Sequence, residues 1–163
     1  MTSDPLKASG SGLLDDLYRE IILDHYRRPR NHDPLQSPTC SADGANPLCG
    51  DTIHLEVDLD GRTIGDIAFA GSGCSISQAS ASMMTEYVKG RSVDDARRGA
   101  EAFQLMMTSG EPQSLEGFDD IDALLGVAKF PARVKCASLA WKTLEQALEG
   151  GGTASTEKDA SHD

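Results

Sequence analysis

The chain has 163 residues with 26 acidic and 15 basic side chains, so its formal net charge at pH 7 is −11. This balance argues against a protein that wraps nucleic acid or lies on an anionic membrane, since either would need a basic face. A chain of this length can bury roughly two-thirds of its unfolded surface in one domain, so it needs no disulfide framework to fold.

Neither end of the sequence indicates a targeting segment or a membrane anchor. Residues 1–12 lack the apolar core of a signal peptide and are expected to form a disordered leader. No apolar run approaches the ~20 residues needed to span a bilayer. The cytoplasm is therefore the expected location, and cysteines there are more often reduced, metal-bound or catalytic than paired in disulfides.

The first predicted helix covers residues 13–28. Its apolar side chains recur at spacings of three and four residues, and Pro29 ends it. His25 lies on one face of this helix, and we expect it to be packed or solvated rather than to be a ligand. Residues 31–51 are rich in Pro, Asn, Asp, Ser and Gly, which indicates an irregular loop with one weak strand near 39–45.

A β-hairpin is predicted next. Apolar and polar residues alternate over residues 52–59, the period of a half-buried strand. Asp60-Gly61 is a two-residue turn signal, and residues 62–70 return as the second strand. His54 lies on the polar face of the first strand, close to the proposed site, and is a minor candidate for a functional group.

Two further helices follow the hairpin. Ser75 and Gln78 form a capping box, which predicts a helix over residues 76–90. The next helix begins after the N-cap residue Ser92 and ends near Met107. The methionines of this half of the chain are expected to fill the core rather than to form a cofactor box: Met83, Met84, Met106 and Met107.

The C-terminal part contains one more helix. A loop and a short apolar segment fill residues 108–127. Phe130-Pro131 then marks the start of the last helix, because proline is tolerated in the first turn. This helix is expected to end near Glu149, and residues 150–163 are expected to be a flexible tail.

Three of the four cysteines are placed so that they could converge on one point. Cys49 lies in the irregular loop, Cys74 at a predicted helix start and Cys136 in the first turns of the last helix. If these segments meet at one end of the sheet, their sulfurs and the Asp51 carboxylate form a complete tetrahedral set for Zn²⁺. Each cysteine could instead be a small buried apolar residue. Cys40 lies in a polar loop without a partner motif and is left out of the set.

The charge of such a site would need compensation. Three thiolates and one carboxylate around Zn²⁺ give a formal charge of −2. Arg133 and Lys135 precede Cys136 by three and one residues, so they are placed to offset this charge. Asp51 has a competing interpretation as a turn or cap residue.

Four motifs resemble those of the IscU-like (NifU N-terminal) superfamily of iron–sulfur assembly proteins: Asn-Pro-Leu-Cys-Gly-Asp at 46–51, Gly-Ser-Gly-Cys-Ser-Ile-Ser-Gln-Ala-Ser at 71–80, Met-Met-Thr-Glu at 83–86 and Phe-Pro-Ala-Arg-Val-Lys-Cys-Ala at 130–137. The resemblance implies a single α+β domain over residues 13–149. In this fold a small antiparallel sheet has helices packed on one side.

Within this superfamily the chain is more similar to the SufU branch than to the IscU scaffold branch. Scaffold members carry a histidine immediately before the last cysteine, where this sequence has Lys135. Residues 100–125 take the place of an insertion found in SufU-type proteins. The first strand of the family would fall in residues 35–46, where this sequence has little β propensity.

The resemblance implies a zinc site formed by Cys49, Asp51, Cys74 and Cys136. It also implies a zinc-dependent sulfurtransferase that takes persulfide sulfur from a SufS-type PLP-dependent cysteine desulfurase and passes it to a SufBCD-type assembly complex. Our hypothesis for the mechanism is that a desulfurase side chain, a histidine by resemblance, displaces Cys49 from zinc. The released thiolate would attack the outer persulfide sulfur, and Arg133 would dock the partner or screen the charge of the site.

Two other functions stay open at this point. Three thiolates and an aspartate could hold iron or a [2Fe–2S] cluster, which would make the chain a cluster assembly scaffold. A structural zinc adaptor would carry no sulfur on any cysteine.

Overall fold

A four-stranded sheet forms one layer of the protein, with the strands in the order β3 (Thr63–Ser72), β2 (Asp51–Asp60), β1 (Cys40–Asn46) and β4 (Gly152–Ser155). The computed structural model describes residues 5–150 and 152–155 and, within them, the side chains of residues 15–150. In chain order the elements are α1 (Pro5–Arg27), β1 (Cys40–Asn46), β2 (Asp51–Asp60), β3 (Thr63–Ser72), α2 (Ser75–Val88), α3 (Val93–Ser109), the 3₁₀ helix η1 (Ile121–Lys129), α4 (Pro131–Leu148) and β4 (Gly152–Ser155).

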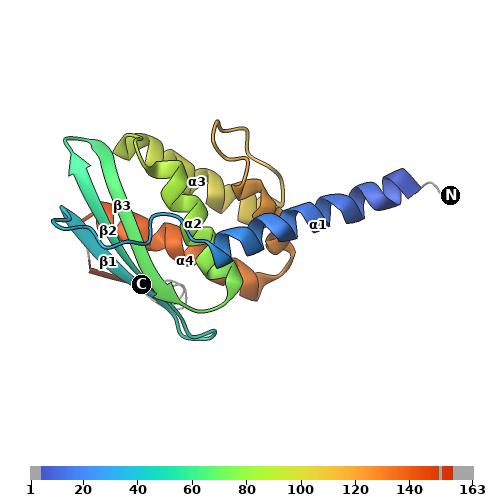
Figure 1. The fold of residues 1–163 in the computed structure, drawn as a ribbon, viewed down its shortest axis with the longest axis horizontal. Helices are drawn as coiled ribbons and strands as arrows, with labels where there is room; N and C mark the ends of the chain where they lie inside the picture. The colour runs from blue at the N-terminus through green and yellow to red at the C-terminus, as the bar shows by residue number, and fades with distance from the viewer. Residues whose placement is uncertain (1–4, 151, 156–163) are drawn as a thin grey trace.

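The first three strands form an antiparallel meander (Figure 1). The predicted hairpin is confirmed: Asp60 pairs with Thr63 across the turn, and Gly61 adopts a φ of 65° there. This left-handed conformation suits glycine, which has no Cβ to clash. At the other end of β2, Asn46 pairs with Asp51, so a four-residue connection joins β1 to β2.

Helices α2 and α4 pack against the sheet, and α3 and η1 pack against α4 (Figure 1). The alternation predicted for β2 is confirmed, because Ile53, Leu55 and Val57 are at most 1% exposed. Burial of one such side chain contributes ~1.5–3 kcal/mol. The four methionines expected in the core are buried as well. These observations confirm an α+β fold in which helices pack on a small sheet with three antiparallel strands.

The structure differs from the expectations at both ends of the chain. Helix α1 begins at Pro5, so residues 5–12 of the expected disordered leader are helical. Proline fits the first turn of a helix, where its missing N–H has no partner to lose. Residues 152–155 of the expected tail form β4, which pairs in parallel with β1. The remaining residues of the predicted leader and tail lie outside the described part.

The segment of weak β propensity is strand β1, as the family resemblance implied. Its residues obtain their ladder hydrogen bonds from β2 on one side and β4 on the other. Pairing of this kind outweighs the intrinsic preference of individual residues, since β propensity depends strongly on context.

The helix starts are largely as predicted. Ser92 caps α3 by accepting a 3.0 Å hydrogen bond from Asp95 N, and α4 begins at Pro131. The capping box is wrong: α2 begins at Ser75, and its N-cap is Cys74. The extended backbone of Cys74 places its carbonyl to accept the first helical hydrogen bond, 3.2 Å from Gln78 N.

His25 is a packed residue, as expected. Its side chain is fully buried, with Nδ1 2.8 Å from Ser82 Oγ and Nε2 2.8 Å from Asp120 Oδ2. These contacts tie α1 to α2 and to the start of η1.

Among the described helices, none combines the length and apolar character needed to cross a membrane.

Candidate metal centre

The connection between β1 and β2 presents the first thiol. Cys49 lies in this connection and is exposed, as is Leu48 beside it, which is 70% exposed. The Cys49 amide donates a 3.2 Å hydrogen bond to the Asn46 carbonyl, and Gly50 turns the chain with a φ of 70°. The turn therefore holds the Cys49 backbone while its side chain stays accessible.

Asp51, the first residue of β2, is completely buried. Its Oδ1 atom accepts a 2.9 Å hydrogen bond from Cys74 N, and its Oδ2 atom lies 3.9 Å from Cys74 Sγ. One oxygen of the carboxylate is thus held by the backbone and the other is directed toward the sulfurs. The interpretation of Asp51 as a cap is correct in this respect, because Asp51 satisfies an amide at the α2 N-terminus.

Gly73 makes this contact possible. It connects β3 to the N-cap Cys74 with a φ of 142°, a region that residues with a Cβ rarely adopt. A Cβ at this position would also collide with the Asp51 carboxylate. The glycine before Cys74 is therefore required for the close approach of the hairpin to α2.

Cys136 supplies the buried thiol of the site. It lies in the second turn of α4, is fully buried, and its Sγ is 3.3 Å from Cys49 Sγ. Burial raises the pKa of the Cys136 thiol, and its hydrogen bonds with Cys49 and Asp51 raise it further. A bound cation would reverse this effect, because metal coordination deprotonates a thiol.

The donor atoms fit a zinc ion. Ligand atoms of Cys49, Asp51 and Cys136 lie within 4.8 Å of one another. Cys74 lies outside this group, but its sulfur is 3.9 Å from Asp51 Oδ2. Tetrahedral zinc with Zn–S bonds of about 2.3 Å holds its sulfur ligands about 3.8 Å apart. The 3.3 Å contact between the Cys49 and Cys136 sulfurs is close to this spacing, so the ligand atoms of Cys49, Asp51 and Cys136 suit a metal ion.

Cys40, which was left out of the set, and the minor candidate His54 lie elsewhere. Cys40 is at the opposite end of β1 from Asn46, is partly buried, and has its thiol pKa raised by that burial. His54 contacts Asp43 at 2.7 Å and Glu56 at 3.2 Å. The hydrogen bond with Asp43, followed by the one with Glu56, raises the pKa of His54. Neither residue belongs to the group of possible ligands described above.

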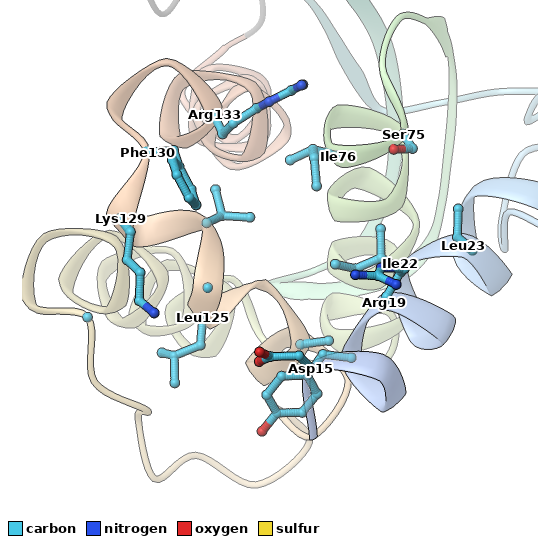
Figure 2. Close-up of a pocket in the computed structure, with 15 residues that line it drawn as sticks. Asp15, Arg19, Ile22, Leu23, Ser75, Ile76, Leu125, Lys129, Phe130 and Arg133 are labelled. Atoms are coloured by element: carbon cyan, nitrogen blue, oxygen red, sulfur yellow. The ribbon is translucent and has the colours of Figure 1, made fainter. Parts of the chain in front are cut away.

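Arg133 lines a groove between α1, η1 and the starts of α2 and α4. The groove has a volume of about 560 Å³. Figure 2 shows Arg133 and Phe130 on one side of it, with Ser75 and Ile76 on the other. Ser75 directly follows Cys74, and Arg133 precedes Cys136 by three residues on α4, so chain neighbours of two candidate ligands line the groove. Phe130, 59% exposed, contributes apolar surface.

Sequence reasoning missed two features of the site. The groove was not foreseen, because its walls come from segments more than 100 residues apart in the chain. Asn46 belongs to the motif at residues 46–51, but the sequence alone assigns it no role. The structure places it at 1% exposure, with Nδ2 donating to Cys136 Sγ at 3.6 Å. Its position three residues before Cys49 was the available signal.

The fold and the site define an α+β protein of the SufU/IscU type, with three cysteines and one aspartate gathered at the end of an antiparallel sheet. The family model described as the NifU-like N terminal domain matches residues 17–150. The chain belongs to this family.

Individual relatives support the assignment. The chain is 49% identical over 141 residues to the zinc-dependent sulfurtransferase SufU of Bacillus subtilis, covering 85% of this chain and 95% of the relative. It is 42% identical over 141 residues to the iron–sulfur cluster assembly scaffold protein IscU of Streptococcus pyogenes, covering 86% and 88%. A solved structure from Fervidobacterium islandicum, a candidate scaffold protein for the SUF system, is 35% identical with a TM-score of 0.74, covering 79% and 94%.

Proposed function

We propose that this chain is a zinc-dependent sulfur carrier of cytoplasmic iron–sulfur cluster assembly, which accepts persulfide sulfur on Cys49. The observation that carries the proposal is the pair formed by the exposed Cys49 thiol and the buried Cys136 thiol, 3.3 Å apart. The exposed Cys49 thiol can contact a partner protein, whereas the Cys136 thiol stays buried in the site. The zinc dependence named for the B. subtilis relative supports the choice of metal.

Cys49, Asp51, Cys74 and Cys136 are the proposed ligands. Zinc, when bound, keeps the thiols as thiolates at neutral pH. The hydrogen bond from the Cys74 amide fixes the orientation of Asp51. Cys74 is fixed as the N-cap of α2, and Cys136 is fixed by the backbone of α4, which contains it. Cys49 is in a turn and is exposed, so it is the ligand that can leave with least disturbance of the fold.

The chemical step is an exchange of one S–S bond for another. The Cys49 thiolate attacks the outer sulfur of a persulfide on a SufS-type cysteine desulfurase. The S–S bond of the desulfurase breaks, its cysteine leaves as a thiolate, and Cys49 carries the S–SH group. No oxidant is consumed. The accessible persulfide would then be passed to a SufBCD-type assembly complex.

The groove described above is the proposed docking surface for the desulfurase. It carries the basic side chains of Arg19, Lys129 and Arg133 around an apolar floor, with Asp15 as its acidic residue. Such a concentration of positive charge stands out in a chain of net charge −11. It favours an acidic partner surface with an apolar anchor and orients that partner next to the thiols.

Mass spectrometry after incubation with a desulfurase and cysteine tests this function. Wild-type protein is expected to gain one sulfur atom on Cys49, and Cys49→Ser is expected to gain none there and to lose stimulation of the desulfurase. Cys40→Ser is the matched control and should behave as wild type. Full stimulation by Cys49→Ser would overturn the role of Cys49. Absence of added sulfur on every cysteine would instead favour a structural zinc adaptor.

A scaffold for [2Fe–2S] clusters is the second candidate. The scaffold name of the S. pyogenes relative favours it, and three thiolates with an aspartate can ligate iron. Protein purified without oxygen separates the two functions. A zinc-dependent carrier is colourless with about one zinc per chain, whereas a scaffold is brown and contains iron and inorganic sulfide.

A further inference from the structure

Asn46 is a buried amide with an incomplete set of partners. Its side chain is 1% exposed, and its Nδ2 donates to Cys136 Sγ at 3.6 Å. Its Oδ1 has no hydrogen-bond partner among the described residues. Burying an unsatisfied carbonyl is unfavourable, so a residue that does so needs a compensating role.

The orientation of the amide suits Cys136 in the thiolate form that a bound metal would produce. A thiolate can only accept hydrogen bonds, and the Asn side chain offers donors at Nδ2 alone. With Nδ2 turned to Cys136, the acceptor Oδ1 is necessarily turned away. The unsatisfied oxygen is therefore the consequence of placing an N–H donor against the sulfur.

The backbone of Asn46 contacts the rest of the site. Its carbonyl accepts the Cys49 amide at 3.2 Å, and its cross-strand partner is Asp51. One residue thus touches Cys136 through its side chain and two other proposed ligands through its main chain. Of the two close thiols, only the buried Cys136 thiol receives the side-chain hydrogen bond that Asn46 donates in this structure. Asn46 contacts Cys49 through the backbone.

We propose that Asn46 is a positioning residue that keeps Cys136 as the retained ligand, so that sulfur is accepted on Cys49. This inference rests on the proposed function. An N–H···S hydrogen bond stabilises charge on sulfur and lowers its electron donation. The Cys136 thiolate is then less reactive toward a persulfide, whereas the exposed Cys49 thiolate keeps its reactivity.

Two variants and one control test the inference. Asn46→Ala removes the donor, and Asn46→Asp keeps the shape but replaces the donor with a carboxylate. Asn31→Ala is the matched control, because Asn31 donates its side-chain amide to Thr85 Oγ1 at 3.1 Å rather than to a cysteine. Thermal melting identifies variants that fold, so that a defect in the site is not confused with unfolding.

The first measurement is the absorption spectrum of the Co²⁺-substituted proteins. Loss of the hydrogen bond raises the energy of the sulfur electrons, so the thiolate-to-cobalt band of Asn46→Ala and Asn46→Asp is expected to move to longer wavelength. Asn31→Ala should match wild type. An unchanged band in both Asn46 variants would overturn the inference, and this result does not depend on whether the protein carries sulfur.

The second measurement maps added sulfur after turnover with a desulfurase. The share of sulfur on Cys136 relative to Cys49 is expected to rise about tenfold in Asn46→Ala, the scale of one hydrogen bond to a charged group. An unchanged ratio would contradict the inference. If wild-type protein gains no sulfur on Cys49, the proposed function fails, and the cobalt spectra still decide the contact between Asn46 and Cys136.

Discussion

Asp51 Oδ1 lies 2.9 Å from the backbone nitrogen of Cys74 and accepts its hydrogen. This contact joins the start of β2 to the N-cap of α2, two positions that are 23 residues apart. Because one carboxylate oxygen is used in this way, only Oδ2 is directed to the sulfurs.

Replacing Asp51 separates its structural contact from its charge. Asp51→Ala removes the acceptor and leaves the Cys74 amide without a partner, so the metal-free protein is expected to lose ~1–3 kcal/mol of unfolding free energy. Asp51→Asn keeps the acceptor oxygen and should lose much less. Urea unfolding of the two metal-free variants measures the difference. Equal losses would show that the hydrogen bond to Cys74 is not the stabilising contact.

Gly73→Ala is expected to damage the site more than an ordinary glycine substitution. The new Cβ would collide with the Asp51 carboxylate, and the φ of 142° is strained for alanine. We expect a loss of ~1–3 kcal/mol from the backbone alone, together with reduced zinc content. Gly126→Ala is the control, because a Cβ there meets no atom within 4 Å. Metal analysis measures the zinc content, and urea unfolding measures the free energy. Equal zinc content and equal unfolding free energy in the Gly73→Ala and Gly126→Ala variants would contradict the role of Gly73.

Removal of zinc is expected to lower the melting temperature of the protein. Binding to the folded state stabilises it, and the four proposed ligands, which come from three segments, cannot form the same site in the unfolded chain. Calorimetry with and without a chelator measures the change. In Cys136→Ser the melting temperature should respond less to the chelator, whereas Cys40→Ser should respond as wild type does. A melting temperature that the chelator leaves unchanged in wild type would argue against a structural contribution of the metal.

Charge reversal at Arg133 should weaken the encounter with the desulfurase. Arg133→Glu places a negative charge in the groove, so the KM for this protein in the desulfurase assay is expected to rise about tenfold, with little change in kcat. Arg98→Glu is the control, since Arg98 is exposed and pairs with Asp95 on α3. High salt should reduce the difference between wild type and Arg133→Glu. A fall in kcat without a change in KM would contradict docking.

Protonation of His54 is predicted to make a pH-dependent contribution to the unfolding free energy. Its pKa is raised above 6.5 by the hydrogen bonds with Asp43 and Glu56. Protonation is therefore more favourable in the folded state, so the stabilisation is fully present below the unfolded pKa and is lost as pH rises through the folded pKa. His54→Gln should lower the unfolding free energy below pH 6.5 and have little effect near ~pH 9. Urea unfolding at several pH values checks this, and an effect of equal size at all pH values would contradict it.

The local elements of the fold followed from the sequence. The Asp60-Gly61 turn and the alternation along β2 gave the hairpin, and Pro131 gave the start of α4, because these signals act within a few residues. Strand β4 could not be predicted in this way, since Gly152–Ser155 pairs with the edge of β1 through its backbone. Pairing between distant segments leaves little pattern in either one.

The candidate site was predictable as a set of residues but not as an arrangement. The cysteine motifs indicated Cys49, Asp51, Cys74 and Cys136, and the structure brings their segments together. Helix α2 begins one residue earlier than predicted, which makes Cys74 the N-cap. The contact between Asn46 and Cys136 spans 90 residues, so it depends on how α4 lies against β1. Sequence spacing contains no direct record of that packing.

The thiols of Cys49 and Cys136 are 87 residues apart in the chain, which has a consequence for the ligand exchange proposed above. An ion held by both would act as a reversible cross-link that closes a long loop, and ordering such a loop costs entropy. The residues on α2 and α4 close most of that loop without Cys49. Departure of Cys49 would therefore release only the short turn between β1 and β2, while the cross-link between α2 and α4 stays in place.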